Sequence, residues 1–486
     1  MAELTFKDAT ELAELIRKRE VSSRELLDQY LAQVERTNPK LNAIVTFDLE
    51  RAKKRADEAD QALARGENWG PLHGVPITIK DTLETEGLRT TAGAPELSGH
   101  VPTKDAVSVA RLKGAGAIIF GKTNTPLYAG DGQAYNEIFG TSSNPWDLTR
   151  SPGGSSGGAA AAIAAGLTGV ELGSDIGGSI RSPAHVCGVY GHKPTHGIIP
   201  LRGHIPGPPG TIAETDIGVV GPIARSARDL DLTFSVLAGP SEDRGIAWQL
   251  DLPRPRRSSL REYRVAAWLD DSAFPVDAQL RARLEAAVEA LRRDGVTVND
   301  RARPDIDFAR ANRIYINLLL PILSGGIPEE AFKKMAAIGD AVPSDTIDPR
   351  AASAHATTIR HREWIAMNEE RERYRARWAD FFRDYDVLLC PPMSVAAIEH
   401  DHSEPIGSRT LTVNGKKTPY FDALLPWAGL IGMVLLPSTC APVGRTPAGL
   451  PVGMQIVGPY LEDRTTIDFA RRLGAVIGGY ERPPGC

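Results

Sequence analysis

The sequence predicts an α/β fold in which short strands alternate with helices around a largely parallel sheet. Three runs of β-forming residues, at 75–79, 117–120 and 169–172, are separated by glycine-rich turns and helical segments. A further strand at 263–269, an amphipathic helix at 278–293 and a strand at 296–298 read as one more βαβ-like unit. Alternation of this kind is typical of α/β folds, because neighbouring parallel strands need a crossover connection.

The first part of the chain, to about residue 66, is expected to be helical. Ser22 and Glu25 form a capping box, and the residues that follow place Leu26, Tyr30 and Val34 on one apolar face. A second, highly charged helix is expected at 49–65.

A proline- and arginine-rich segment at 252–259 reads as a linker, residues 305–385 are mostly helical and charged, and short apolar strands resume at 387. Because strands return after the helical region, we expect an insertion within one fold. We therefore predict a single domain, 1–486, with N-terminal helices at 1–66 and a catalytic core at 70–240. The rest of this domain is predicted to consist of an inserted α/β and helical region on the substrate side, at 251–385, and a C-terminal part at 386–486 that returns to the core sheet.

The composition excludes several classes of protein. A net charge of −5 on 486 residues gives no general attraction to nucleic acid. The four cysteines are far apart and form no CxxC pair, as expected of reduced thiols. The first ten residues lack the features of a signal peptide, and the apolar run at 159–170 is far shorter than the roughly 20 residues that span a bilayer. We expect a cytoplasmic protein with no membrane or nucleic-acid partner.

Glycine is concentrated in two loops that also carry serines, SPGGSSGGAAAA at 151–162 and GSDIGGSIR at 173–181. A glycine-rich loop that enters a helix presents free backbone N–H groups, which suit an anion or an oxyanion. Phosphate binding is one possibility, although neither loop has the GxxxxGK[ST] or GxGxxG pattern.

Two hydrolytic chemistries also fit these loops. Residues 153–157 match the GxSxG pattern of an α/β-hydrolase, which would need an acid and a histidine such as His185, His192 or His196. Alternatively, a serine hydroxyl is activated by a lysine that its surroundings keep neutral, and Lys80 ends the apolar run GVPITIKD at 74–81. The spacing alone does not join Lys80 to the two loops.

Taken together, these motifs resemble the amidase signature family. GVPITIKD, GKTNTP at 121–126, RSPGGSSGGAAAAIAAG at 150–166 and GSDIGGSIRSPAHVCGVYGHKPTHG at 173–197 match its long glycine–serine signature, and GLPVGMQIVGP at 449–459 also fits. The resemblance runs from about residue 8 to 475. It implies a central twisted mixed β-sheet covered on both sides by α-helices.

The resemblance also implies a Ser–cisSer–Lys triad. Ser179 would be the nucleophile, Ser155 the bridging serine in a cis peptide, and Lys80 the general base. The backbone N–H groups of Ile176, Gly177, Gly178 and Ser179 would form the oxyanion hole. Residues expected to contact the substrate are Ala129, Gly130, Asp131, Gly132 and Ser156.

Other motif residues are expected to have structural roles. Asp175 and Arg181 flank the nucleophile and are expected to hold its loop in shape, and Cys187 is expected to pack in an apolar segment. The histidine spacings at 192–196 and 399–402 resemble metal motifs weakly, so we expect no metal and no cofactor.

Two segments distinguish this chain from the glutamine-amidotransferase A-type branch of the family, whose members work in a complex on charged tRNA. This chain reads PLYAGDGQ at 126–133, where that branch favours other residues, and the two also differ at 201–216. We expect the 201–216 segment to be a mobile loop near the mouth of the site. We therefore expect a stand-alone hydrolase, monomeric or homodimeric, and the alternative is an amidotransferase-type subunit. Its small-molecule substrates would be uncharged alkyl or aryl amides, and by resemblance anilides, esters and carbamates, including urethanes. Apolar residues of the 300–385 helices would form one wall, among them Ile314, Tyr315, Leu318 and Leu319.

Overall fold

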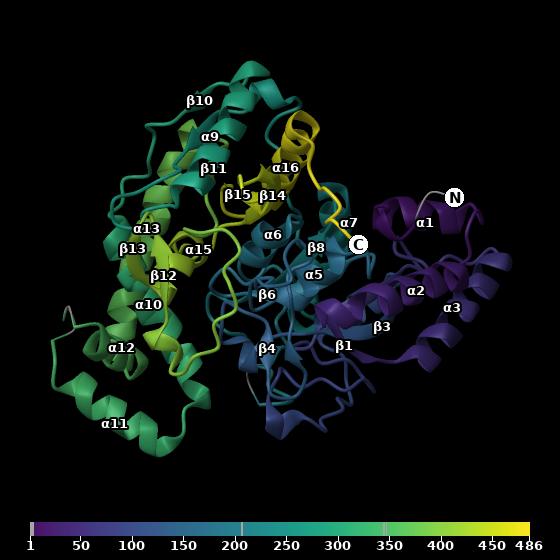
Figure 1. The fold of residues 1–486 in the computed structure, drawn as a ribbon, viewed down its shortest axis with the longest axis horizontal. Helices are drawn as coiled ribbons and strands as arrows, with labels where there is room; N and C mark the ends of the chain where they lie inside the picture. Colours follow the sequence, from purple (N-terminus) through teal and green to yellow (C-terminus); the bar gives the residue numbers. More distant parts are fainter. Residues whose placement is uncertain (1–3, 206–207, 344–345, 347) are drawn as a thin grey trace.

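Two sheets of unequal size organise the computed structural model, which describes residues 4–205, 208–343, 346 and 348–486 (Figure 1). The larger sheet has the strand order β10-β9-β11-β15-β14-β7-β8-β6, and the smaller one the order β1-β3-β2. The strands of the larger sheet are β6 (Glu171–Asp175), β7 (Tyr190–Lys193), β8 (Val219–Ala224), β9 (Val265–Ala267), β10 (Val298–Asn299), β11 (Val387–Cys390), β14 (Ser438–Arg445) and β15 (Pro451–Val457). Those of the smaller sheet are β1 (Ile44–Phe47), β2 (Pro76–Lys80) and β3 (Ile118–Thr123).

The larger sheet is mixed, so the prediction of a largely parallel sheet is wrong, and the mixed sheet implied by the family resemblance is confirmed. Among its described strands, only β9 pairs in parallel, with β10 and β11, whereas every pairing from β11 to β6 is antiparallel. The turn at 446–450 between β14 and β15 is too short for the crossover that parallel strands need.

Helices cover both faces of the larger sheet, as the α/β prediction requires. The helices α5 (Gly157–Ala164) and α6 (Arg181–Cys187) pack on one face, and α7 (Ala227–Leu237), α9 (Ala278–Arg293) and α16 (Asp463–Ile477) on the other. Every residue of α5 is buried, and its sequence GGAAAAIA has only one side chain larger than a methyl group. These small residues let α5 fit between β6, β8 and β2.

The N-terminal segment contains the predicted helices and one strand that the prediction missed. The helices are α1 (Ala9–Arg17), α2 (Ser23–Leu41) and α3 (Leu49–Ala64), and Ser22 and Glu25 make the expected capping box. Between α2 and α3, β1 pairs antiparallel with β3. Four residues of β-type sequence between two long helices were too weak a signal to detect.

Residues 305–385 are mostly helical, as predicted, and their helices lie to the left in Figure 1. These helices are α10 (Phe308–Leu323), α11 (Glu329–Asp340), α12 (Pro349–Thr357) and α13 (His361–Asp384). The βαβ-like unit is confirmed, since β10 is parallel to β9 and α9 begins and ends at the predicted residues. The remaining helices and strands include α4 (Val107–Gly114), α8 (Glu242–Gly245), α14 (Tyr420–Leu424), α15 (Pro426–Met433) and the pairs β4 (Tyr135–Asn136) with β5 (Gly140–Thr141) and β12 (Thr410–Val413) with β13 (Lys416–Pro419). No helix in the described part of the chain is both long and apolar enough to cross a membrane.

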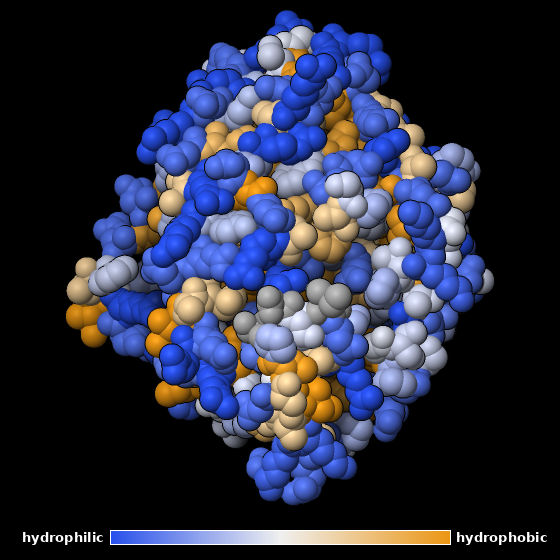
Figure 2. Space-filling model, turned by 90° about the vertical axis from the view of Figure 1, so that its left-hand side faces the viewer, coloured by the Kyte–Doolittle hydropathy of each residue, from blue (hydrophilic) through white to orange (hydrophobic). Residues whose placement is uncertain are grey.

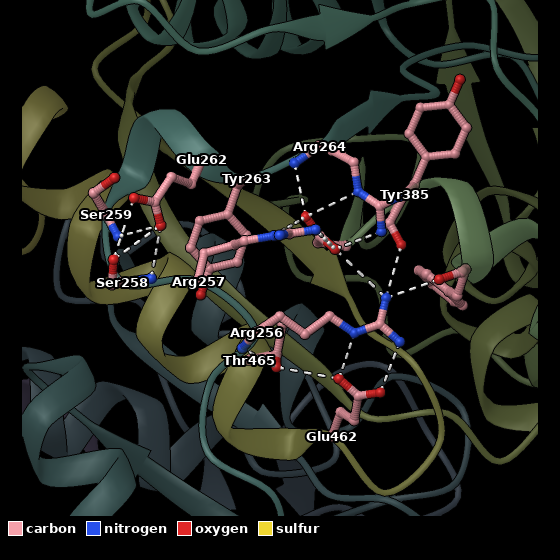
Figure 3. A network of polar contacts seen from close by, with 12 residues as sticks. Arg256, Arg257, Ser258, Ser259, Glu262, Tyr263, Arg264, Tyr385, Glu462 and Thr465 are labelled. Carbon is pink, nitrogen blue, oxygen red and sulfur yellow. Dashed lines mark hydrogen bonds and ion pairs between the residues drawn. The ribbon is translucent and has the colours of Figure 1, made fainter.

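The segment predicted to be a linker is held firmly by a network of arginines (Figure 3). Arg256 makes two hydrogen bonds to the Glu462 carboxylate, at 2.6 and 2.7 Å. Arg257 and Arg264 both donate to Asp386, whose side chain is fully buried. Burial by itself raises the pKa of Asp386, but the hydrogen bonds from these two arginines outweigh it and hold the pKa well below its usual range. The network fastens the start of the inserted region to β11 and α16.

Replacing Asp386 with Asn should destabilise the protein by about 3 kcal/mol, because it leaves the arginines without their buried counter-charge. Equilibrium unfolding in urea at neutral pH measures this change. The folded-state pKa of Asp386 is depressed, so the carboxylate stabilises the fold above the usual pKa of Asp and loses its effect in acid. The difference in the free energy of unfolding between the wild type and Asp386→Asn should therefore become smaller as the pH falls.

The matched control is Asp340→Asn, which removes the ion pair between Asp340 and Arg360. Both side chains of this pair are largely exposed, at 62% and 67% respectively. This control should change stability by no more than about 0.5 kcal/mol. Equal effects of the two substitutions would contradict the role assigned to Asp386.

Candidate active site

Lys80 is the last residue of β2, a strand whose five residues are all buried. The alternation of side chains along PITIK directs Ile77 and Ile79 to one face and Thr78 and Lys80 to the other. The Lys80 side chain is fully buried, and its Nζ lies 2.6 Å from Ser155 Oγ and 3.0 Å from both Ser156 Oγ and Ser174 Oγ. The amine is thus surrounded by hydroxyl groups, and it makes no ion pair with any residue that the structure describes.

This environment favours the neutral amine. Burial lowers the pKa of Lys80 to about 7, against the opposing effects of the Asp175 and Glu171 carboxyl groups. A lysine amine that is half deprotonated near neutral pH can accept a proton from a serine hydroxyl. The structure therefore brings together Lys80 and the first serine loop, which the sequence alone did not connect.

Ser155 lies in the loop that precedes α5, and the Gly154–Ser155 peptide bond is cis. Gly154 passes so close to another segment that an added Cβ would lie 2.5 Å from the backbone N of Gln133 and 2.6 Å from the Asp131 carbonyl oxygen. Only glycine fits this close approach. Ser156, expected to contact the substrate, is fully buried and bonds instead to Lys80 and to the backbone of Ser174.

Ser179 lies in the tight turn between β6 and α6, at the wall of a cavity. Its carbonyl oxygen accepts a hydrogen bond from Ser156 N at 3.2 Å, which joins the two serine loops directly. Gly178 has a φ of +105°, a left-handed conformation that favours glycine.

Asp175 holds this turn in place. Its carboxylate accepts hydrogen bonds from the amides of Gly178 and Ile180, and it pairs with Arg181 at 2.8 Å. Burial raises the pKa of Asp175, but the Arg181 guanidinium outweighs it and lowers the pKa to about 2. Arg181 is fully buried and also donates to Ala428 O and to the Gln455 side chain, so its guanidinium serves the loop rather than the cavity.

These contacts correct the expected set of oxyanion donors. The Gly178 amide, expected to be one of them, donates to Asp175 Oδ1 at 2.9 Å. The amides of Ile176, Gly177 and Ser179 make no hydrogen bond to any described residue. They are the three amides of the turn that remain available as donors, and all three residues line the cavity.

The cavity beside Ser179 has a volume of about 1190 Å³. The segment expected to contact the substrate, Ala129, Gly130, Asp131 and Gly132, forms part of its wall. Of the four α10 residues expected there, Tyr315 and Leu319 line the cavity, whereas Ile314 and Leu318 are buried in the core. The Tyr315 hydroxyl donates to Ile176 O at 3.1 Å, so α10 is attached directly to the turn that carries Ser179.

Apolar side chains dominate the rest of the wall. They come mainly from α10 and its neighbours, and include Phe274, Ile316, Leu320, Leu323, Ile327 and Met335. On the side of the molecule where α11 and α12 lie, the surface is mostly hydrophilic, with apolar residues gathered in its lower part (Figure 2). No described residue of the 201–216 segment lines the cavity, and residues 206–207 lie outside the described part.

Sequence reasoning missed the residues that hold the 129–132 segment. Arg409 is fully buried and pairs with Asp131 at 2.7 Å, and its guanidinium also bonds to the Tyr135 hydroxyl. The second oxygen of Asp131 accepts a hydrogen bond from the Tyr420 hydroxyl at 2.7 Å. Arg409 lies 278 residues from Asp131 in a hydrophilic loop, where it resembles any surface arginine in the sequence.

The other candidate motifs have ordinary surroundings. His192 is buried between Thr439 and Asp463, and His196 bonds to Thr215 O. Within the described residues, no group of three or more His, Cys, Asp or Glu side chains is placed to hold a metal. Cys187 is buried and donates to Pro152 O at 3.4 Å, and burial raises the pKa of its thiol.

Comparison with known proteins gives a consistent result. The family model described as Amidase matches residues 25–467. The A-type subunit of glutamyl-tRNA(Gln) amidotransferase from Roseiflexus sp. (strain RS-1) is 30% identical over 521 residues, which cover 99% of this chain and 98% of that protein.

Solved structures extend this similarity. The structure of 6-aminohexanoate cyclic dimer hydrolase is 28% identical, with a TM-score of 0.78 and coverage of 99% of both chains. A chain from a vestigial complex that bears on the origins of an s-triazine catabolic enzyme is 27% identical, with a TM-score of 0.79 and coverage of 98% of this chain and 100% of that one.

Replacing Arg409 with Met should destabilise the protein by about 3 kcal/mol, because the substitution leaves Asp131 as an unpaired buried carboxylate. Amide hydrogen exchange should rise locally, in residues 129–135, and urea unfolding measures the global loss. Arg383→Met removes an exposed pair with Asp380 and should be nearly neutral. Unchanged exchange at 129–135 in the Arg409 variant would show that the ion pair does not hold this segment.

Proposed function

Because the chain belongs to the amidase family, we propose that it is a stand-alone serine amidohydrolase that cleaves C–N bonds through an acyl-enzyme on Ser179. The observation that carries this proposal is the buried Lys80 amine, which lies 2.6 Å from Ser155 Oγ and has a pKa near neutrality. A lysine is otherwise costly to bury, and here it is placed to act as a base.

In the proposed mechanism, Ser179 Oγ attacks the amide carbonyl while its proton passes to Ser155, and the proton of Ser155 passes to Lys80. The amides of Ile176, Gly177 and Ser179 donate to the oxyanion that forms. One such donor is worth about 3 kcal/mol of the activation barrier in other hydrolases. The rigid turn that Asp175 and Arg181 hold keeps these donors aligned without reorganisation.

The relay then runs in reverse. Lys80 returns a proton through Ser155 to the leaving nitrogen, and the amine departs from the acyl-enzyme. Water attacks the acyl carbonyl with Lys80 again acting as base, which releases the carboxylic acid and restores Ser179.

The cavity supports uncharged alkyl or aryl amides as substrates. Four charged residues line the cavity, of which Asp131 and Glu404 are paired with Arg409, whereas Arg313 and Asp422 make no ion pair with a described residue. The α10 wall is otherwise largely apolar. Similarity to 6-aminohexanoate cyclic dimer hydrolase is consistent with small amides. The same acyl chemistry extends the proposal to anilides, esters and carbamates, including urethanes.

An amidotransferase-type subunit is the second candidate, since curated relatives that are similar over almost the whole length of this chain include such subunits. The two candidates differ in what the purified chain does alone. A stand-alone hydrolase turns over small amides and purifies as a monomer or homodimer. An amidotransferase-type subunit is inactive alone and co-purifies with a second polypeptide.

Replacing Ser179 with Ala should reduce turnover of a nitroanilide or a nitrophenyl carbamate by about a thousandfold or more, because the nucleophile is lost. A panel of amides, anilides, esters and carbamates assayed with the purified chain measures this and defines the preferred bond. Ser353→Ala, which changes a serine of α12 that lines the same cavity, should retain activity. Activity that survives the loss of Ser179 would rule out the proposed mechanism.

The pH dependence should follow Lys80. The base works as the neutral amine, so kcat/KM should rise with pH and level off above the Lys80 pKa of about 7. Lys80→Arg keeps the positive charge but does not release a proton at these pH values, so it should be as inactive as Lys80→Met. A flat profile through neutral pH, or an active Lys80→Arg variant, would contradict the role of Lys80 as base.

A further inference from the structure

A second buried ionisable group lies near the Lys80 amine. Glu171 is the first residue of β6, the edge strand of the larger sheet, which packs against β2 of the smaller one. Its side chain is fully buried, and its Oε2 accepts a hydrogen bond from Leu172 N at 2.9 Å. Its Oε1 is buried and accepts no hydrogen bond in the described part of the chain.

The neighbours of Glu171 place its carboxyl group beside the strands that position Lys80. The hydroxyl groups of Thr78 and Thr123 oppose the effect of burial on the pKa of the carboxyl group, although neither hydroxyl makes a hydrogen bond to a described residue. Thr78 is two residues before Lys80 on the same face of β2, and Thr123 of β3 is the register partner of Lys80. Farther along β6, Ser174 Oγ lies 3.0 Å from Lys80 Nζ.

The other ionisable side chains near Lys80 make ion pairs or hydrogen bonds of their own. Asp175 is paired with Arg181, and Asp81 accepts hydrogen bonds from Thr91. Lys122 of β3 donates to Leu83 O and Thr85, and the His204 imidazole is neutral because burial and the Lys80 charge lower its pKa. Asp81 and Glu171 are therefore the two carboxyl groups around Lys80 that have no ion-pair partner among the described residues. Asp81 directly follows Lys80 in the chain, so the alternation of side chains directs it to the opposite face, which leaves Glu171 as the candidate.

Burying such a carboxyl group is costly, and an apolar side chain would fill the same space at no electrostatic cost. Burial raises the pKa of Glu171 to about 7, so its charge changes in the same pH range as that of Lys80. Groups arranged in this way are typical of functional sites.

We propose that Glu171 is a positioning residue of the hydrolytic site, whose carboxylate supplies the counter-charge for the Lys80 ammonium group without touching the substrate. This inference rests on the proposed function. As the bond between Ser179 Oγ and the carbonyl carbon forms, the carbonyl π electrons move to oxygen and one proton moves through Ser155 to Lys80 Nζ. Lys80 gains the positive charge that balances the oxyanion, and its three hydroxyl contacts carry no charge to stabilise it.

The direct test follows the protonation of Lys80 itself and needs no turnover. In protein labelled with ¹³C at lysine Cε, the Lys80 signal, assigned with Lys80→Met, is titrated in the wild type and in Glu171→Gln. Loss of a nearby carboxylate favours the neutral amine, so the Lys80 midpoint should fall by about one unit in the variant. A midpoint that coincides with the wild-type value would overturn the proposal.

The matched control is Asp229→Asn, which removes another buried carboxyl group, bonded to Thr10 and Ala9 away from the site. It should destabilise the protein and leave the Lys80 midpoint unchanged, and an equal shift in this control would overturn the proposal. If Glu171→Gln does not fold, the Thr123→Val variant tests the proposal instead. Removing that hydroxyl raises the pKa of Glu171 and should lower the Lys80 midpoint by a smaller amount, whereas no change would count against the proposal.

The pH dependence of kcat/KM provides a second measurement, which a purely structural role of Glu171 would leave unchanged. In Glu171→Gln the rise of kcat/KM with pH should begin at lower pH than in the wild type, by the same shift as the Lys80 midpoint. A profile that only scales down, with its midpoint unmoved, would contradict the inference. The proposed function stands or falls separately, on wild-type turnover and its loss in Ser179→Ala.

Discussion

The burial of the Lys80 amine among uncharged hydroxyl groups is the constraint on which the rest of the site depends. Three serines contact this amine, two from the loop before α5 and one from β6, so both glycine-rich loops must meet at the end of β2. Such a meeting requires close backbone approach. Gly154 passes against the backbone of 131–133, and Gly178 adopts a left-handed conformation. The glycine content of the two loops thus follows from the need to surround one buried lysine.

Two buried ion pairs hold the loops that surround this lysine. Asp175 pairs with Arg181 under the Ser179 turn, and Asp131 pairs with Arg409 behind the 129–132 segment. Desolvating such pairs offsets much of their Coulomb attraction, so their effect is mainly to select one geometry. Asp175 also accepts hydrogen bonds from backbone amides, and Asp131 accepts one from the Tyr420 hydroxyl. These additional hydrogen bonds restrict the conformation of both loops. Because these four charges are used within the protein, they add no unpaired charge to the cavity, whose wall is largely apolar.

The proposed catalytic residues and much of the cavity wall come from different parts of the chain. The interface between the two sheets holds Lys80, Glu171 and the serine loops, whereas α10 to α12 form much of the cavity. The hydrogen bond from Tyr315 to Ile176 O joins the two parts at the oxyanion turn. The helices thus contribute mainly the shape of the cavity, and the sheets position the proposed base and nucleophile. The arginine network at Asp386 fixes the inserted region to the core sheet without involving the site.

The sequence by itself determined the α/β class, the span of α9 and the capping box of α2, because these depend on local periodicity and capping. It also predicted Lys80, Ser155 and Ser179 as catalytic residues from their motifs, and the structure brings Lys80 and Ser155 within 2.6 Å of each other. It did not determine the antiparallel order of most of the larger sheet, which depends on pairing between distant strands. Nor did it reveal that the Gly178 amide is bound to Asp175, that Arg409 holds Asp131, or that Glu171 faces the strands of the smaller sheet. Only the tertiary structure decided these points, because each depends on groups far apart in the chain that meet where water is excluded and every buried charge or amide needs a partner.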